Sequence, residues 1–239
     1  MISVRLFAAA RNNHGIPNII LRVIDRHPTT VISCHNELSS MKTVILFLLA
    51  TFCAFSQEPK LPKGLYAVFT TSAGTFTAKL FEKDTPESVR TFVGLAQGTK
   101  PWKDPRTGKM VSRPLYDNLL FYRSIAGDMI QSGSPTGTTA YDCGFTIRDE
   151  FLPGLRFDLG GKLAMANAGN DNSGGCQFFI TLGPVPRWNG KYAIFGSIVQ
   201  GMDVVEKINH LPAHGEEPVN PAKLIHVDIT RVGPEPRKH

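Results

Sequence analysis

The sequence predicts a mainly β protein, in which a closed β-barrel is capped by two α-helices. Three observations lead to this fold class. Short segments of alternating apolar and polar residues recur along the chain, and only two segments carry apolar residues at helical spacing. The 239 residues also include 22 Gly and 17 Pro, which favour frequent turns. A closed barrel hides the edges of a sheet, and two capping helices account for the small helical content.

A β-hairpin and a helix come first. Residues 64–71 (GLYAVFTT) and 75–81 (TFTAKLF) alternate and are rich in aromatic and β-branched residues, with Ser72-Ala73-Gly74 as the turn between them. Thr85 then offers a helix N-cap, and a proline and an acid follow it. Gly98 predicts the end of this helix, whose apolar face consists of Val89, Phe92, Val93 and Ala96.

The middle of the chain predicts short strands between loops. Residues 99–114 form a loop with three prolines, and Trp102 is expected to anchor it to the body of the protein. Residues 121–133 (FYRSIAGDMIQSG) predict two short strands around a small turn. After a Gly- and Thr-rich segment, residues 145–151 (FTIRDEF) resemble another strand.

The last part of the chain completes the barrel. Buried strands are predicted at residues 162–166 (KLAMA), 176–183 (CQFFITLG) and 192–199 (YAIFGSIV). Residues 201–211 (GMDVVEKINHL) predict a short second helix, since their apolar residues share one helical face. The closing strand is predicted from the alternation of Ile225, Val227 and Ile229. We find no internal repeat and no domain linker.

Residues 41–56 have the form of a secretory signal peptide. Met41 and one lysine precede an apolar run that ends in small and polar residues, with cleavage expected after Ser56. The run is shorter than the ~20 residues that span a bilayer, so we expect no stable membrane insertion after cleavage. Signal peptides are N-terminal, so we interpret Met41 as the true start and residues 1–40 as a disordered upstream translation artefact. An internal anchor or a buried strand is the alternative. Residues 57–239 then form one domain, periplasmic or secreted.

Charge and common motifs exclude several classes of function. Removing residues 1–56 takes away five basic and two acidic residues, so the net charge falls from +6 to +3. No basic run with interleaved aromatics remains, and we expect no nucleic-acid partner. The chain lacks G-x-S-x-G, H-E-x-x-H, C-x-x-C and G-x-x-x-x-G-K patterns. We therefore expect no metal site. Cys143 and Cys176 remain in the mature chain, which leaves a disulfide open.

The remaining polar and apolar residues suit the binding of a peptide rather than its cleavage. Met129 and Gln131 share one face of a strand at period 2, as do Gln177 and Phe179. Ordinary packing is the alternative for Met129 and Phe179, but a buried amide must find partners. The full set of candidates is Arg123, Met129, Gln131, Asn167, Gln177, Phe179, Trp188 and Tyr192.

Taken in order, these motifs resemble the cyclophilin family of peptidyl-prolyl isomerases. The resemblance runs from residue 65 to residue 232 and is carried by FYRSIAGDMIQSG with PTGT, MANAG, QFFI, WNGKYAIFG and GMDVVEKI. It implies an eight-stranded antiparallel barrel with two capping helices. It also implies isomerisation of proline-containing polypeptides without a cofactor, here by a monomer that assists the folding of exported proteins.

The resemblance assigns a role to each matching position. Arg123 falls on the catalytic arginine and Gln131 on its partner. The proline pocket falls on Met129 and Phe179, with Trp188 where the family usually has Leu and one place after the tryptophan of many animal members. Tyr192 replaces the usual His. The groove that pairs with the substrate backbone falls on Ala166, Asn167 and Gln177.

The implied mechanism is electrostatic. Rotation about a peptide bond is opposed by a resonance barrier of ~20 kcal/mol. A guanidinium near the prolyl nitrogen draws off its lone pair and weakens that resonance in the twisted state.

Asp128 departs from the pattern, because the family usually has Phe there as one wall of the proline pocket. A carboxylate is costly to bury in an apolar pocket, so we expect Asp128 to face water or to pair with Arg123. This predicts a weak or specialised isomerase with a wider or more polar pocket. A re-threaded turn, with Tyr122 or Trp188 filling the wall, is the alternative.

Two further expectations follow from the resemblance. The segment holding Cys143 and the residue before Gln177 border a secondary pocket in the family fold, which implies a Cys143–Cys176 disulfide that closes a loop of about 34 residues. The competing function is a peptide-binding module on the same barrel with little or no turnover. A lipocalin-type small-ligand barrel is disfavoured by the amide-lined face.

Overall fold

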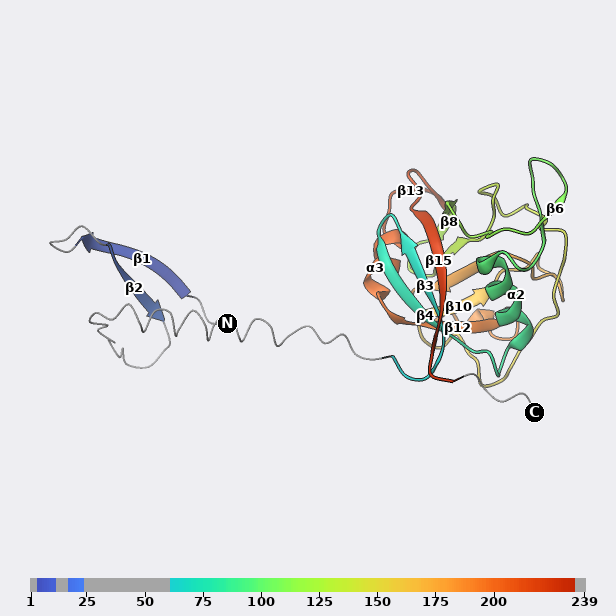
Figure 1. Cartoon of the computed structure of the whole chain (residues 1–239), viewed down its shortest axis with the longest axis horizontal. Coiled ribbons are helices and arrows are strands. Elements are labelled where there is room, and N and C mark those ends of the chain that lie inside the picture. The colour runs from blue at the N-terminus through green and yellow to red at the C-terminus, as the bar shows by residue number, and fades with distance from the viewer. Residues whose placement is uncertain (1–3, 12–16, 24–60, 235–239) are drawn as a thin grey trace. The chain divides into compact units, whose positions relative to one another are not determined.

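The computed structural model describes residues 4–11, 17–23 and 61–234 in two separate compact units, within residues 1–60 and 61–239 (Figure 1). In the first unit, β1 (Val4–Arg11) pairs antiparallel with β2 (Pro17–Val23). This hairpin differs from the disorder expected for residues 1–40, and β2 is rich in the β-branched residues that favour strands. The start at Met41 and the signal peptide stay predictions, since residues 41–56 lie outside the described residues.

The second unit is built on one nine-stranded sheet, in the order β7-β15-β3-β4-β12-β10-β11-β9-β8. Every printed pairing in it is antiparallel. Its strands are β3 (Gly64–Thr71), β4 (Gly74–Leu80), β7 (Leu119–Leu120), β8 (Arg123–Ile125), β9 (Met129–Ser132), β10 (Lys162–Met165), β11 (Phe178–Thr181), β12 (Ile194–Gln200) and β15 (Lys223–Val232). The predicted first hairpin, the short strands around residues 126–128 and the later strands are thereby confirmed.

The sheet is curled but open. Its two end strands, β7 and β8, do not pair with each other among the described residues. Phe121, which lies between them, instead donates its backbone N–H to the carbonyl of Ala222 at 2.9 Å. The closed eight-stranded barrel is therefore not confirmed, whereas the mainly β class with two packed helices is.

Both predicted helices form, as α2 (Pro86–Gln97) and α3 (Met202–Asn209), and they lie on opposite sides of the strands in Figure 1. Helix α2 ends at Gly98, which has a φ of 74° and donates to carbonyls of the last turn. It begins at Pro86 with Thr85 at the N-cap position, as predicted, but the Thr85 side chain makes no capping bond. No described helix has both the length and the apolar character that crossing a membrane requires.

The carboxylate of Glu150 caps α2 instead. It accepts the backbone N–H groups of Glu87 at 3.0 Å and Ser88 at 2.8 Å, and the Ser88 hydroxyl at 2.7 Å. Residues 145–151, which contain Glu150, do not form the expected strand. Their backbone contributes a single isolated bridge, Ile147 to Gly174, while Glu150 is turned toward the helix.

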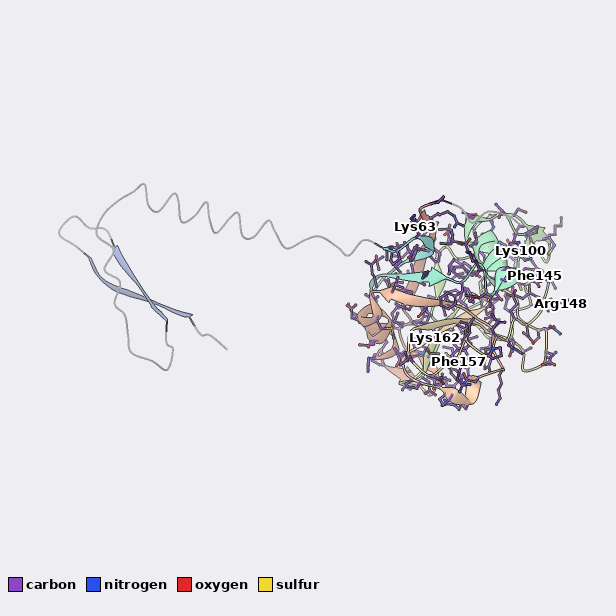
Figure 2. The ribbon with its side chains drawn as sticks, turned by 90° about the horizontal axis from the view of Figure 1, so that it is seen from below. Lys63, Lys100, Phe145, Arg148, Phe157 and Lys162 are labelled. Atoms are coloured by element: carbon purple, nitrogen blue, oxygen red, sulfur yellow. The ribbon has the colours of Figure 1, made fainter. Side chains whose placement is uncertain are left out.

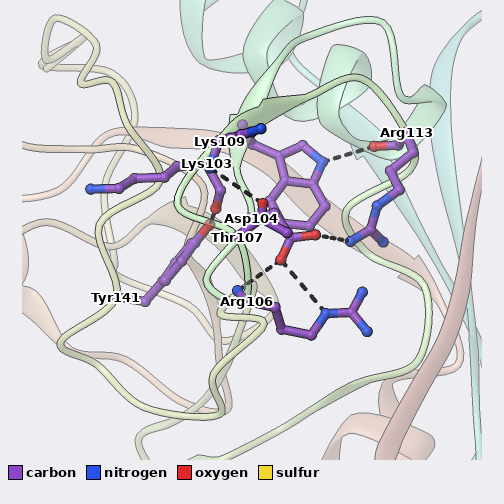
Figure 3. A network of polar contacts seen from close by, with 8 residues as sticks. Lys103, Asp104, Arg106, Thr107, Lys109, Arg113 and Tyr141 are labelled. Atoms are coloured by element: carbon purple, nitrogen blue, oxygen red, sulfur yellow. Dashed lines mark hydrogen bonds and ion pairs between the residues drawn. The ribbon is translucent and has the colours of Figure 1, made fainter.

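The predicted loop at residues 99–114 contains a small hairpin, β5 (Trp102–Lys103) paired with β6 (Met110–Val111). Trp102 is buried and donates its indole N–H to the carbonyl of Arg113 at 2.8 Å, as an anchor should. The loop is further held by Asp104, whose carboxylate accepts the backbone N–H of Arg106 at 2.9 Å and Nη2 of Arg113 at 2.8 Å (Figure 3).

The strands β9 and β11, most of β10 and the first three residues of β12 are buried on both faces, and this creates the platform for the site. Alternate residues, for example Phe178 and Ile180 of β11, point into a main core. This core also contains apolar side chains of both helices. The residue between them, Phe179, faces the other way into a smaller group that we call the outer cluster. The outer cluster consists of Met129, Phe157, Ala164, Phe179, Val185 and Ile194.

Candidate active site

A groove of about 670 Å³ lies over the outer cluster. Its lining brings together all nine residues that the sequence predicted as catalytic or substrate-binding. These are Arg123, Met129, Gln131, Ala166, Asn167, Gln177, Phe179, Trp188 and Tyr192. They come from β8, β9, β11, the end of β10 and the short helix η1 (Pro186–Trp188), with Tyr192 beyond it. Segments separated by up to about 70 residues thus form one surface.

One end of the groove is an aromatic pocket. The ring of Phe179 meets Trp188 at 5.3 Å and 79°, and Tyr192 at 5.2 Å and 85°. Trp188 and Tyr192 are 5.8 Å apart at 73°, so the three rings stand edge to face around a common space. Met129 is buried beneath them in the same cluster. A pocket of this kind suits a compact apolar ring.

The polar side of the groove begins with a cross-strand pair. The register of β8 and β9 places Arg123 directly opposite Gln131. Nη1 of Arg123 donates to Oε1 of Gln131 at 3.1 Å, and Gln131 is only 4% exposed. Gln131 is held in turn, because its Nε2 donates to the Tyr122 hydroxyl and to Oε1 of Gln177, both at 3.0 Å. The buried amide therefore presents a fixed acceptor to the guanidinium.

Tyr122 is a member of this network that sequence reasoning did not assign to it. Its hydroxyl also donates to Oε1 of Gln177. Burial raises the pKa of Tyr122 above its ordinary value of 10.0, so the hydroxyl stays a donor at neutral pH. The requirement that a buried Gln131 find partners was the signal that pointed to such a neighbour.

Asn209, at the end of α3, fixes the turn between β8 and β9. Its Oδ1 accepts the backbone N–H of Gly127 at 2.9 Å, and its Nδ2 donates to the carbonyls of Ile125 at 2.9 Å and Met129 at 3.2 Å. The residue is buried. Nothing local in the sequence indicates this role, because Asn209 is about 80 residues away from the turn that it holds.

The structure corrects the expectation for Asp128. Its carboxylate pairs with Nη2 of Arg187, not with Arg123, and its side chain is 26% exposed. Arg187 also stacks 5.1 Å from the ring of Trp188. Arg187 and Ile125 line the groove, whereas Asp128 is not among the lining residues. The acid therefore sits behind the rim of the pocket and fixes an arginine there.

Arg123 instead has a different acidic partner, Glu216, in the turn between β13 (Ala213–His214) and β14 (Glu217–Pro218). Nε of Arg123 lies 2.6 Å from Oε2 of Glu216. This contact was not predicted.

Beyond the aromatic pocket, the side chain of Asn167 forms hydrogen bonds with other groups of the protein. Its Nδ2 donates to the carbonyl of Lys191 at 2.9 Å, and its Oδ1 accepts the backbone N–H of Gly169 at 3.1 Å. The N–H of Ala166 is bonded to the carbonyl of Gln177 at 2.9 Å. The side chain of Asn167 thus shapes the loop that borders the groove.

The far part of the groove is lined by Cys143 and Cys176. Both are buried free thiols in the structure, so the disulfide implied by the resemblance is not formed there and stays a prediction for the exported protein. Burial raises the pKa of Cys176 well above its ordinary value of 9.0. The neighbouring wall includes Phe145, over whose ring the ammonium of Lys100 lies at 4.3 Å from the centroid (Figure 2).

Comparisons with known proteins agree with this geometry. Residues 66–229 match the family model described as "Cyclophilin type peptidyl-prolyl cis-trans isomerase/CLD". The peptidyl-prolyl cis-trans isomerase A of Mycobacterium tuberculosis is 40% identical over 167 residues, which cover 69% of this chain and 91% of that protein. The peptidyl-prolyl cis-trans isomerase B of Streptomyces anulatus is 40% identical over 152 residues, covering 63% of this chain and 86% of that protein.

Solved structures give the same result. A crystal structure of a Cryptosporidium parvum cyclophilin type peptidyl-prolyl cis-trans isomerase aligns with a TM-score of 0.60 and 28% identity, covering 70% of this chain and 98% of that one. The same protein crystallised in the presence of the dipeptide Ala-Pro aligns equally well and is covered to 99%. With the groove, its arginine–glutamine pair and its aromatic pocket in place, these matches show that the chain belongs to the cyclophilin family of peptidyl-prolyl cis-trans isomerases.

Proposed function

We propose that this protein isomerises X–Pro bonds in exported polypeptides, with Arg123 stabilising the twisted amide. The observation that carries the proposal is the position of Arg123, which lines the groove together with the aromatic pocket and is held by a buried glutamine. The Ala-Pro dipeptide present with the Cryptosporidium parvum relative supports a proline-containing ligand for the same groove.

The proposed step needs no covalent intermediate. The prolyl ring enters the pocket of Phe179, Trp188 and Tyr192. The guanidinium of Arg123 directs one of its N–H groups toward the prolyl nitrogen as a hydrogen-bond donor. Donation to that nitrogen is favourable only when its lone pair leaves conjugation, which happens in the twisted state. The interaction therefore stabilises the transition state more than the planar ground state, which is the requirement for catalysis.

Asp128 is proposed to tune this pocket through Arg187. The pair places a guanidinium beside Trp188 on the rim, where the family has an apolar wall. A charged rim weakens the grip on apolar residues next to proline, and this supports a specialised isomerase. Asp128→Phe should then raise turnover on a standard X–Pro peptide. Unchanged or lower turnover would contradict the tuning role.

The exported setting is inferred from the leader alone. Residues 41–56 have the features of a signal peptide, and we infer release of a periplasmic or secreted protein that begins at Gln57. N-terminal sequencing of the protein recovered from the extracytoplasmic fraction tests this. Recovery of the intact leader in the cytoplasmic fraction would contradict it.

The activity is tested with the full-length chain on a short X–Pro peptide. We expect clear acceleration of isomerisation and a loss of roughly 100-fold or more in Arg123→Ala, the size seen when one transition-state donor is removed. The matched control is Arg90→Ala, because Arg90 lies on the exposed face of α2 and does not line the groove. It should retain wild-type activity.

The same assay decides the alternative of a peptide-binding module without turnover. The ion pair at Asp128 favours that alternative, since it replaces an apolar wall by a charged rim. Saturable binding of an X–Pro peptide, without acceleration by either wild type or Arg123→Ala, would establish the module and reject the enzyme.

A further inference from the structure

We propose that Glu216 is a positioning residue for isomerisation, which holds one edge of the Arg123 guanidinium so that the other edge faces the substrate. This inference rests on the proposed role of Arg123. It adds a residue outside the groove to the catalytic arrangement, on a hairpin that the sequence did not connect with the site.

The guanidinium of Arg123 is held at two of its three nitrogens. Nε lies 2.6 Å from Oε2 of Glu216, and Nη1 lies 3.1 Å from Oε1 of Gln131. A guanidinium is planar, so two contacts to different elements fix both its position and the direction of its plane. Among the described residues, Nη2 has no hydrogen-bond partner. It is the nitrogen left for a ligand.

The backbone places Glu216 for this contact. Its own carbonyl accepts the N–H of Ser124, the residue after Arg123, at 2.8 Å. The turn also contains Gly215, whose φ of 65° suits a glycine, and it is closed by the N–H of Val219 on the carbonyl of Pro212 at 2.8 Å. A main-chain hydrogen bond therefore joins the hairpin to β8, and this places the side chain of Glu216 against Arg123.

The position of Glu216 indicates that it supports Arg123 rather than blocking its access to the substrate. Arg123 lines the groove and Glu216 does not, so the carboxylate binds the guanidinium from behind. Their side chains are 34% and 52% exposed, and an ion pair with that exposure contributes little to folding stability. Its effect should appear in turnover instead, because a long arginine side chain otherwise samples many rotamers. A blocking contact would have the opposite consequence, since its removal would free Arg123 and raise turnover.

The experiment compares full-length Glu216→Ala and Glu216→Gln with wild type. We expect Glu216→Ala to lower kcat about three- to tenfold with KM little changed, because the aromatic pocket is untouched. Glu216→Gln should retain most of the activity, since its amide oxygen still accepts from Nε. The matched control is Glu217→Ala, an exposed acid on the same hairpin that should behave as wild type. Unchanged or raised turnover in Glu216→Ala would overturn the proposal.

A second readout follows Arg123 directly. In NMR spectra of the wild type, the Nε–H proton of Arg123 should be protected from solvent exchange, and this protection should vanish in Glu216→Ala and persist in Glu216→Gln. Equal exchange in all three proteins would overturn the proposal even if turnover were too slow to measure.

Failure of the proposed function gives a different pattern. If Arg123→Ala were as active as wild type, the catalytic role of Arg123 would be lost whatever Glu216 does. If Arg123→Ala is inactive and Glu216→Ala is unaffected, only the role of Glu216 is wrong. In the Arg123→Ala background, Glu216→Ala should have no further effect, since its partner is gone.

Discussion

Tyr122→Phe tests whether the buried hydrogen-bond network positions the catalytic arginine. The substitution keeps the ring and deletes one hydroxyl, which donates to Gln177 and accepts from Gln131. The two amides keep their mutual bond of 3.0 Å, so neither is left without a partner. A typical intramolecular hydrogen bond contributes about 0.5–1.5 kcal/mol net. We therefore expect Tyr122→Phe to lower the free energy of unfolding by about 1–2 kcal/mol.

The same change should also reduce turnover. If the whole of that energy served to orient Arg123, turnover would fall by about 5–30-fold. We expect the lower end of this range, because Glu216 still holds the opposite edge of the guanidinium. The measurements are urea unfolding and kcat/KM on an X–Pro peptide. The loss of activity should not vary with pH around neutrality, since burial raises the pKa of Tyr122 and the hydroxyl stays protonated.

Tyr66→Phe is the matched control. The Tyr66 hydroxyl donates to the carbonyl of Pro62 at 2.6 Å, and Tyr66 does not line the groove. Its loss should lower stability by about 1 kcal/mol and leave kcat/KM unchanged. If Tyr122→Phe matched wild type in both unfolding midpoint and kcat/KM, the network would be incidental and the reasoning wrong.

Three further predictions concern stability. Glu150→Ala should lower the free energy of unfolding by about 1–2 kcal/mol in urea, because it uncaps α2 at Ser88; an unchanged midpoint would refute the cap. Gly98→Ala should lower the free energy of unfolding by more than about 1 kcal/mol in the same urea experiment, since the φ of Gly98 is 74° and the new Cβ would lie 2.5 Å from the backbone of the loop that follows the helix. An unfolding free energy equal to that of the wild type would show that this loop moves to accommodate the methyl group. The imidazole Nδ1–H of His226 donates to the carboxylate of Asp117 at 2.6 Å, and this hydrogen bond raises the pKa of His226 above 6.5. Its contribution to stability is therefore complete below that value and is lost as pH rises through the raised pKa. His226→Gln should therefore be less stable than wild type by at most about 1 kcal/mol at acidic pH and equal to it at alkaline pH, and a gap that does not narrow would contradict this.

Local patterns identified most of the elements of the fold. The alternation at residues 64–71 and 75–81, the helical spacing after Thr85 and Gly98 as a terminator all correspond to observed elements. These signals depend on neighbours in the chain, so they can be read without tertiary information. The strand predicted at residues 145–151 was wrong for the same reason. Its alternation is real, but the segment serves a distant helix through Glu150.

The residues of the candidate site were predicted, but most of the hydrogen bonds and ion pairs that hold them were not. The resemblance to the family paired Arg123 with Gln131, and the short turn between β8 and β9 places the two residues opposite each other. The partners Glu216, Asn209 and Arg187 lie 59 to 93 positions from the residues that they hold. No periodicity connects such distant positions.

The sequence by itself determined a mainly β chain with two helices and a set of amide, aromatic and guanidinium groups suited to a prolyl peptide. Only the tertiary structure decided that Asp128 binds Arg187 and that Glu216 binds Arg123. The physical reason is that each carboxylate could satisfy its charge with any basic group within reach. Which one is within reach depends on how the β13–β14 hairpin and η1 dock against β8 and β9.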